Sequence, residues 1–207
     1  MQSVIQQAPT TRDGILDACD RIMARLGFRK MTMDNLAREA AVSRRTIYLH
    51  FKSKEDVGLS SIGRVVENVH AKLNDLLLSE VDSPEKLRLM LNLRVMGRIE
   101  QIGDYYHSLD DLFEIVRPAY MARRRQMFDR EIELITHVLE DGKASGHFSF
   151  DSARRTARHM LLATNAFLPY SLSIRELGEP DAIRLQVSGM VDLLIRGVRV
   201  LPGETSC

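Results

Sequence analysis

The side chains best suited to a chemical task lie in one segment of this 207-residue chain, Thr32 to Phe51, with the sequence TMDNLAREAAVSRRTIYLHF. Arginine can pair with O6 and N7 of guanine through two hydrogen bonds, and threonine can contact the methyl group of thymine. Tyrosine and lysine suit phosphate groups, which the free N–H groups at a helix N-terminus also attract. We therefore expect double-stranded DNA as a partner. The candidate contacts are Thr32, Ser43, Arg44, Arg45, Thr46, Tyr48, His50 and Lys54.

The spacing within this segment predicts two short helices joined by a tight turn at residues 40–42. Thr32 and Ser43 are residue types that cap helix N-termini. Leu36 and Ile47 are placed to point into a shared core. This is the helix-turn-helix pattern, whose second helix lies in the major groove. The alternative is a pair of amphipathic helices in an ordinary bundle that binds no DNA.

The charge of the chain is unevenly distributed. The formal net charge is only +1, but residues 1–54 hold ten Lys/Arg and five Asp/Glu, a net charge of +5. The remaining 153 residues carry a net charge of −4. A basic first quarter attached to a mildly acidic remainder indicates that an electrostatic surface for nucleic acid is confined to one end of the chain.

Several classes of protein find no support. The six histidines show no metal-ligand spacing, and there is no GxSxG motif, phosphate-binding glycine loop or Cys/His nucleophile pair, so we predict no metal, no cofactor and no enzymatic activity. No apolar run is long enough to cross a bilayer, and the first ten residues do not resemble a secretory signal. The two cysteines, Cys19 and Cys207, favour a reducing cytoplasm.

Helical periodicity predicts an all-α protein of about nine helices. A three-helix DNA-binding domain with an N-terminal arm is expected over residues 1–54, and a larger helical domain over residues 55–207. In the larger domain, the apolar segment 87–102 predicts a central buried helix. A short helix over 108–115 should precede a long one that starts at Arg117-Pro118. Asp151 should cap a helix ending near Leu168, and Pro180 should open the last helix.

Residues 12–54, and above all AVSRRTIYLHFKSKEDV (41–57), resemble the TetR/AcrR family of transcriptional regulators. In that family a Ser after the turn is followed by Thr-x-Tyr-x-His-Phe-x-x-Lys and acidic residues. The matching positions are Ser43, Thr46, Tyr48, His50, Phe51, Lys54 and Glu55, with an LLIRG-type ending at 193–197. One position departs from the pattern. Ala41 stands where glycine is usual, and a left-handed backbone there would cost about 1 kcal/mol relative to glycine.

The resemblance implies a homodimer, formed as a four-helix bundle by the last two helices, roughly 152–173 and 180–199. A dimer agrees with the need for two recognition helices on a palindromic operator. The apolar faces of these helices could also close the core of a single protomer. The resemblance further implies a repressor that an unidentified small-molecule effector releases from DNA. A regulator controlled by a partner protein, or an activator, is the alternative.

The candidate effector-pocket residues are Arg94, Arg98, Tyr105, Tyr106 and Asn165. Arg94 and Arg98 are four residues apart on an apolar helix, and such a buried pair would favour an anionic ligand. In the alternative interpretation they pair with Glu100 or Asp104, or extend to solvent. The basic run 123–125 is interpreted as a solvated face, with Arg125 paired to Asp129.

Overall fold

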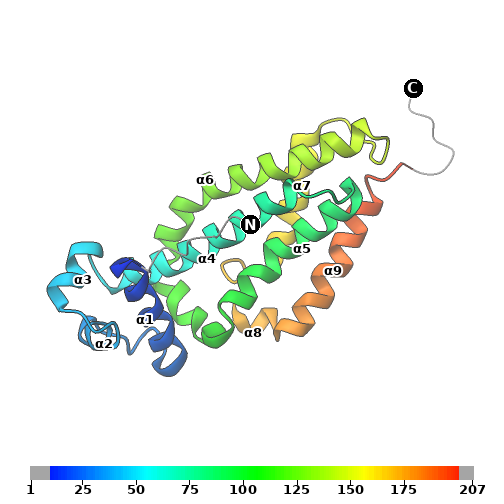
Figure 1. Ribbon diagram of the computed structural model, residues 1–207. Coiled ribbons are helices and arrows are strands. Elements are labelled where there is room, and N and C mark those ends of the chain that lie inside the picture. Colours follow the sequence, from blue (N-terminus) through cyan, green and yellow to red (C-terminus); the bar gives the residue numbers. More distant parts are fainter. Residues whose placement is uncertain (1–9, 201–207) are drawn as a thin grey trace. The chain divides into compact units, whose positions relative to one another are not determined.

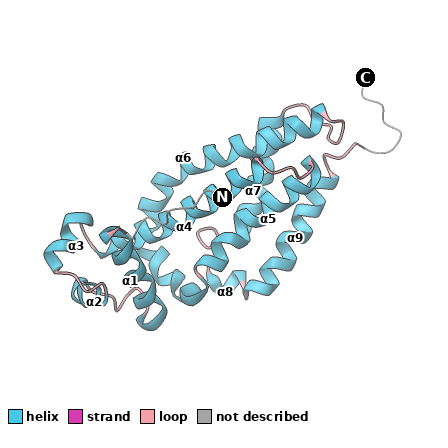
Figure 2. Cartoon of the chain, in the orientation of Figure 1, coloured by secondary structure: helices cyan, strands magenta, loops and turns pink. Residues whose placement is uncertain are grey.

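The computed structural model describes residues 10–200 and contains only helices, loops and turns, apart from a single bridge between Phe148 and Arg199 (Figure 2). The predicted all-α fold is confirmed. The segment examined for a secretory signal and Cys207 lie outside the described residues. The α-helices are α1 (Thr11–Leu26), α2 (Met33–Glu39), α3 (Arg44–His50), α4 (Lys54–Leu77), α5 (Ser83–Gln101), α6 (Leu109–Ala144), α7 (Ala153–Thr164), α8 (Ile174–Leu177) and α9 (Pro180–Arg196) (Figure 1). Two 3₁₀ segments, η1 (Gly103–Ser108) and η2 (Asn165–Phe167), complete the elements.

The chain divides into two compact units. The first comprises the described residues up to Arg64 together with Asp104–Arg117, and the second comprises Val65–Gly103 and the described residues from Pro118 onward. The division therefore falls inside α4 and α6 rather than at residue 54. The first unit includes the first turns of α4 and the segment Asp104–Arg117, whose Ser108 hydroxyl donates to the carbonyl of Met23 in α1 at 3.1 Å.

The core of the first unit is made by the inward faces of α1, α2, α3 and the start of α4. Ile15, Cys19 and Ile22 of α1 have no exposed surface, and neither do Leu36 of α2 and Ile47 of α3. Apolar residues at every third or fourth position of a helix lie on one face, so burial of that face holds these short helices together. A seven-residue helix such as α2 or α3 is not stable alone in water and depends on this packing.

Helix α6 differs from the prediction of two helices separated before Pro118. The structure has one helix of 36 residues with Pro118 inside it. Proline removes one backbone hydrogen bond and crowds the preceding turn, but packing on both sides can carry a helix through it. Here the side chains of Val116 and Tyr120, on either side of Pro118, are both buried.

The second unit has α5 at its centre, as its apolar sequence predicted. Helices α5 and α9 run antiparallel along each other (Figure 1). Their register is marked by the Arg88–Asp192 ion pair, the hydrogen bond from Ser188 Oγ to Asn92 Oδ1 at 3.2 Å, and the Arg184–Glu100 pair at 2.9 Å. Helix α7 also packs against α9.

The segment around α7 corrects two predictions. Ser152, not Asp151, is the N-cap, because its hydroxyl accepts the N–H of Arg155. The α-helix ends at Thr164 and continues as η2 to Phe167, and Leu168, which precedes Pro169, adopts an extended backbone. The short helix α8, capped by Ser173, was not predicted.

Candidate nucleic-acid interface and buried arginine cluster

Helices α2 and α3 form the predicted helix-turn-helix, and local capping fixes both starts. Thr32 Oγ1 accepts the N–H of Asn35 at 3.1 Å, and Ser43 Oγ accepts the N–H of Thr46 at 3.0 Å. Both predicted N-caps are therefore confirmed. In the turn between the helices Ala41 has φ = +52°, the left-handed conformation expected from the position usually occupied by glycine.

The outward face of α3 carries the predicted base-contacting side chains. Arg44 and Arg45 are exposed, and Thr46 is half-buried. The Arg44 guanidinium pairs with Asp34 of α2 at 3.2 Å and lies 6.0 Å from the ring centre of Tyr48. Within residues 10–200, Arg45 takes part in no ion pair, so its charge is uncompensated at the surface.

The predicted phosphate-contacting residues fall into two groups. Thr32, Tyr48 and His50 are exposed around α2 and α3. Lys54 is only half exposed, and its ammonium donates to the backbone carbonyls of Phe28, Arg29 and Met31 at 3.2–3.5 Å. Lys54 thereby fixes the loop that leads to α2.

Ion pairs connect α1 to α2 on one face and to α4 on another. Glu39 of α2 accepts hydrogen bonds from Arg21 and Arg25 of α1, both at 2.8 Å, and these pairs lower the pKa of Glu39. On another face of α1, Asp20 accepts from Ser61 at 2.5 Å and from Arg64 at 2.7 Å. Burial raises the pKa of Asp20 in spite of these partners.

One further residue of α3 was missed by sequence reasoning. Leu49 has 75% of its side chain exposed, four residues after Arg45 on the same face. An apolar side chain outside the inward pattern set by Ile47 is the signal that could have identified it. An apolar group at this place can contact a thymine methyl.

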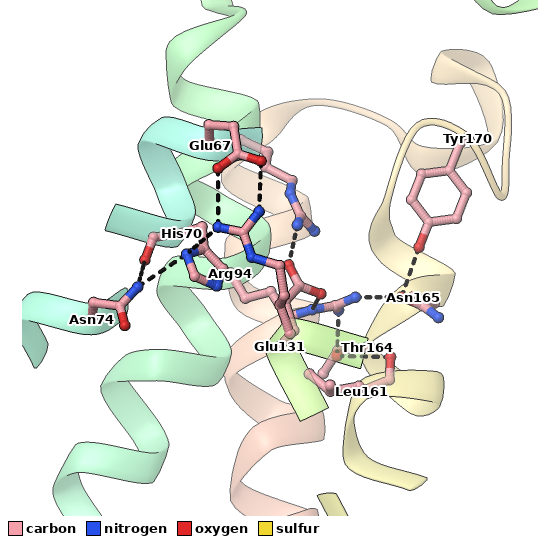
Figure 3. A network of polar contacts seen from close by, with 11 residues as sticks. Glu67, His70, Asn74, Arg94, Glu131, Leu161, Thr164, Asn165 and Tyr170 are labelled. Atoms are coloured by element: carbon pink, nitrogen blue, oxygen red, sulfur yellow. Dashed lines mark hydrogen bonds and ion pairs between the residues drawn. The ribbon is translucent and has the colours of Figure 1, made fainter. Parts of the chain in front are cut away.

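The second unit contains a buried polar cluster centred on Glu131 of α6 (Figure 3). Arg94 Nε donates to Glu131 at 2.8 Å, and Arg98 donates to the other carboxylate oxygen. Arg94 also donates to Thr164 Oγ1 at 3.0 Å and to Asn165 Oδ1 at 2.6 Å. Exposure to solvent is 1% for Arg94, 8% for Arg98 and 3% for Glu131.

The alternative interpretation, in which Glu100 or Asp104 pairs with the two arginines, named the wrong acids, because Glu131 pairs with both. Glu100 pairs with Arg184 instead, and Asp104 lies in the first unit. Burial alone would raise the pKa of Glu131, but Arg94 and Arg98 outweigh it and the net effect is a lowered pKa. The arginines are thus paired inside the protein and do not extend to solvent.

A small cavity of about 10 Å³ adjoins this cluster, room for about one water-sized group. Its lining comprises Val66, Arg94, Arg98, Tyr120, Arg124, Met127, Phe128, Glu131 and Tyr170. Arg124 does not lie on the predicted solvated face: it is half-buried, with its guanidinium 4.6 Å from the ring centre of Tyr170 and 4.9 Å from that of Phe128. The expected pair between Arg125 and Asp129 is not formed among the described residues.

The predicted effector-pocket residues do not all come together. Arg94, Arg98 and Asn165 belong to the buried cluster, and Tyr170, which donates to Asn165 at 2.7 Å, joins them. Tyr105 and Tyr106 lie on η1 in the first unit, where both are buried.

Residues 10–200 show neither a metal-binding cluster nor a membrane-spanning helix. No group of three or more His, Cys, Asp or Glu side chains there is arranged to hold a metal ion. No helix in that part of the chain is long and apolar enough to cross a membrane.

Comparison with known proteins agrees with this architecture. Residues 15–58 match the family model described as bacterial regulatory proteins, tetR family. The transcriptional repressor BepR of Brucella suis is 36% identical over 174 residues, which cover 79% of this chain and 80% of BepR. A transcriptional regulator from Cytophaga hutchinsonii superposes with a TM-score of 0.73 at 18% identity, covering 90% of this chain and 97% of the other. The regulator FadR of Bacillus subtilis, solved in complex with stearoyl-CoA, superposes with a TM-score of 0.67 at 16% identity over 90% of this chain and 98% of FadR.

The fold and the helix-turn-helix define a DNA-binding transcriptional regulator, and such a protein is not an enzyme. The chain belongs to the TetR family. The predicted resemblance to this family is therefore confirmed.

Proposed function

We propose that this protein is a cytoplasmic repressor that binds a palindromic operator as a homodimer and is released by a small-molecule effector. The observation that carries the proposal is the outward face of α3. There Arg44 and Arg45 are exposed on a helix whose opposite side is anchored by Ile47, which has no exposed surface. A rigid helix with two outward arginines is suited to reading base edges in the major groove.

Within this proposal the side chains divide into two roles. Arg44, Arg45 and Thr46 contact base edges. Thr32, Ser43, Tyr48 and His50 contact or orient the phosphate backbone around the N-termini of α2 and α3. Lys54 acts through the loop that it holds, because its ammonium is already engaged by three carbonyls.

The homodimer is proposed to form through α7 and α9. Leu185 and Leu193 of α9 are 77% and 65% exposed, and they lie on one face with Gly189 midway between them. Leu162 of α7 is 47% exposed. Large exposed leucines at helical spacing mark a surface that another protein covers. A second copy of the chain is the partner that we propose for this surface. A palindromic operator is bound by two helix-turn-helix units related by a two-fold axis.

Release by an effector is proposed to be a shift between two populations of the dimer that differ in the distance between the two helix-turn-helix units. The effector must bind one of them more tightly, since equal affinity shifts nothing. The buried cluster around Glu131 supports this proposal, because it joins α5, α6 and α7 in one hydrogen-bonded network beside a cavity.

Selection of bound fragments from genomic DNA with the purified full-length protein tests the proposal. We expect a palindrome whose two halves are protected by one dimer. The operator complex is then challenged with metabolites, drugs, fatty acids and acyl-CoA compounds. A recovered site without two-fold symmetry would overturn the dimeric mode of binding. A site that no compound releases would favour control by a partner protein, and a site from which transcription increases would favour an activator.

A further inference from the structure

Arg98 holds one donor that the cluster around Glu131 does not use. Its side chain is only 9% exposed and lines the cavity, and one of its terminal nitrogens donates to Glu131. Its Nε–H finds no acceptor among residues 10–200. A buried donor of a charged group without an acceptor is costly, so this N–H is a position that an incoming acceptor would satisfy.

The charges around the cavity favour an acceptor that is anionic. Arg94 and Arg98 share the single carboxylate of Glu131, so the buried cluster carries one excess positive charge. The neighbouring Arg130 does not change this balance, because Glu67 pairs with it at 2.8 Å. A buried charge is stabilised by an opposite charge and destabilised when it has none.

The remaining lining is amphipathic. Arg124 brings a third arginine to the cavity, beside Arg94 and Arg98, and its guanidinium lies against the rings of Tyr170 and Phe128. Burial raises the pKa of Tyr120 to about 12, so its hydroxyl stays protonated at neutral pH and remains a polar neighbour without charge. Val66, Met127 and Phe128 supply apolar surface beside these groups.

We infer that this cavity takes the carboxylate of an amphipathic organic acid, with Arg98 Nε and the Arg124 guanidinium as its partners. The inference rests on the proposed function and names the chemical class of its effector. The volume of about 10 Å³ admits one water-sized group such as a single carboxylate oxygen, so the rest of the acid enters by displacing the side chain of Arg124, which lines the cavity. Arg124 is half-buried, and among the described residues only the rings of Phe128 and Tyr170 hold its guanidinium, so displacing it costs less than displacing Arg94.

The same network connects the acid to the proposed dimer helix. Arg98 and Arg94 share Glu131, and Arg94 donates to Thr164 and Asn165 at the end of α7. A carboxylate bound at Arg98 Nε shares the guanidinium with Glu131 and weakens the attraction between Arg98 and Glu131. The hydrogen bonds of Glu131 then change, and Glu131 also binds Arg94. Because Arg94 donates to Thr164 and Asn165, the contacts at the end of α7 change as well.

The test compares acids with neutral molecules of the same shape. The melting temperature and dissociation constant of the full-length protein are measured with butyrate, octanoate and benzoate, each against its amide. Inorganic phosphate and sulfate form a separate arm. We expect at least one acid to bind at least tenfold more tightly than its amide and to release operator DNA, and we expect the inorganic anions to do neither.

Variants locate the binding. Arg124→Met should weaken binding of the active acid at least tenfold, whereas Arg125→Met, at an exposed neighbour that does not line the cavity, should leave it unchanged. Arg98→Lys keeps a positive charge near Glu131 but removes the Nε donor, and it should weaken binding while the circular dichroism spectrum stays that of the wild type.

The inference is overturned if every acid binds no better than its amide, or if tight binding survives both Arg98→Lys and Arg124→Met. It is also overturned if phosphate or sulfate binds as tightly as the organic acids. Release of the operator by a neutral compound would overturn the inference and leave the proposed function standing. A chain that binds no operator at all would overturn the proposed function, whatever the acids do.

Discussion

Arg94 Nε donates to Glu131 at 2.8 Å, and their side chains are only 1% and 4% exposed. Removing one partner of such a pair leaves the other charge buried. We expect Glu131→Gln to lower the free energy of unfolding by about 3–5 kcal/mol. Urea unfolding measures this loss. Glu67→Gln is the matched control, because the Glu67–Arg130 pair is about half exposed and should cost less than about 1 kcal/mol. Equal losses in the two variants would contradict a special role for burial.

The pH dependence of stability follows from the lowered pKa of Glu131. As the pH falls, the unfolded chain takes up this proton first, near the ordinary value of 4.5. The stability contributed by the pair is therefore fully present above that pH and is lost as the pH falls toward the folded-state pKa. The apolar variant R94M/R98M/E131L should be at least as stable as the wild type at neutral pH. Any gain in the free energy of unfolding should be about 1–4 kcal/mol. It should also lose less stability than the wild type between pH 5 and 3. Urea unfolding across this range would contradict the assignment if the two proteins lost stability in parallel.

The helix-turn-helix could be predicted because its determinants are local. Thr32 and Ser43 cap helices through N–H groups three residues away, and the burial of Ile47 follows from spacing within one helix. The partner of Arg94 could not be read in this way, because Glu131 lies 37 residues away on another helix. One signal was available: Glu131 shares a helical face with Phe128 and Ile135, and both of these are buried. An acid on an apolar face requires a buried base.

The second unit was harder to predict, because proline and tertiary packing compete there. Pro118 predicted a helix start, but α6 continues past Pro118 because the residues on either side of it are packed in the core. Pro169 acted as expected on Leu168, yet the α-helix had already ended at Thr164. Tyr105 and Tyr106 were grouped with Arg98 because they follow it in sequence, and the fold assigns them to the other unit.

Ala41 provides a test of backbone strain in the turn before α3. Its φ of +52° is unfavourable for a residue with a Cβ atom, and its side chain is exposed. Ala41→Gly should therefore stabilise the protein by about 1 kcal/mol, measured by urea unfolding. Ala40→Gly is the matched control. Ala40 has φ = −82°, so the change removes no strain and should destabilise by about 0.5–1 kcal/mol. The same sign of effect in both variants would contradict the strain.

The exposed leucines of α9 test the proposed dimer. Leu193→Glu places a charge on each side of a two-fold interface, so we expect a loss of about 2 kcal/mol or more per protomer, about thirtyfold in affinity for each substituted side chain. Sedimentation equilibrium measures the monomer–dimer constant. Leu78→Glu, at a leucine that is 81% exposed and lies just beyond α4, is the control and should leave the constant unchanged. A dimer that persists in Leu193→Glu with wild-type affinity would place the interface elsewhere.

Arg44 tests the proposed reading of bases by α3. Its pair with Asp34 is more than half exposed on both sides and worth less than about 1 kcal/mol, so the guanidinium is available to a guanine. Arg44→Ala should weaken operator binding by about 1–3 kcal/mol and relax base preference at one position of each half-site. Lys54→Ala should instead weaken binding to every duplex alike, because the loop before α2 loses its anchor. Its salt slope should stay near that of the wild type, whereas loss of a direct phosphate contact would lower it by about 0.9. Fluorescence anisotropy with operator, single-base variants and unrelated duplexes at several salt concentrations separates these outcomes. Unchanged base preference in Arg44→Ala would remove this residue from the reading surface and leave Arg45 and Thr46 to carry it.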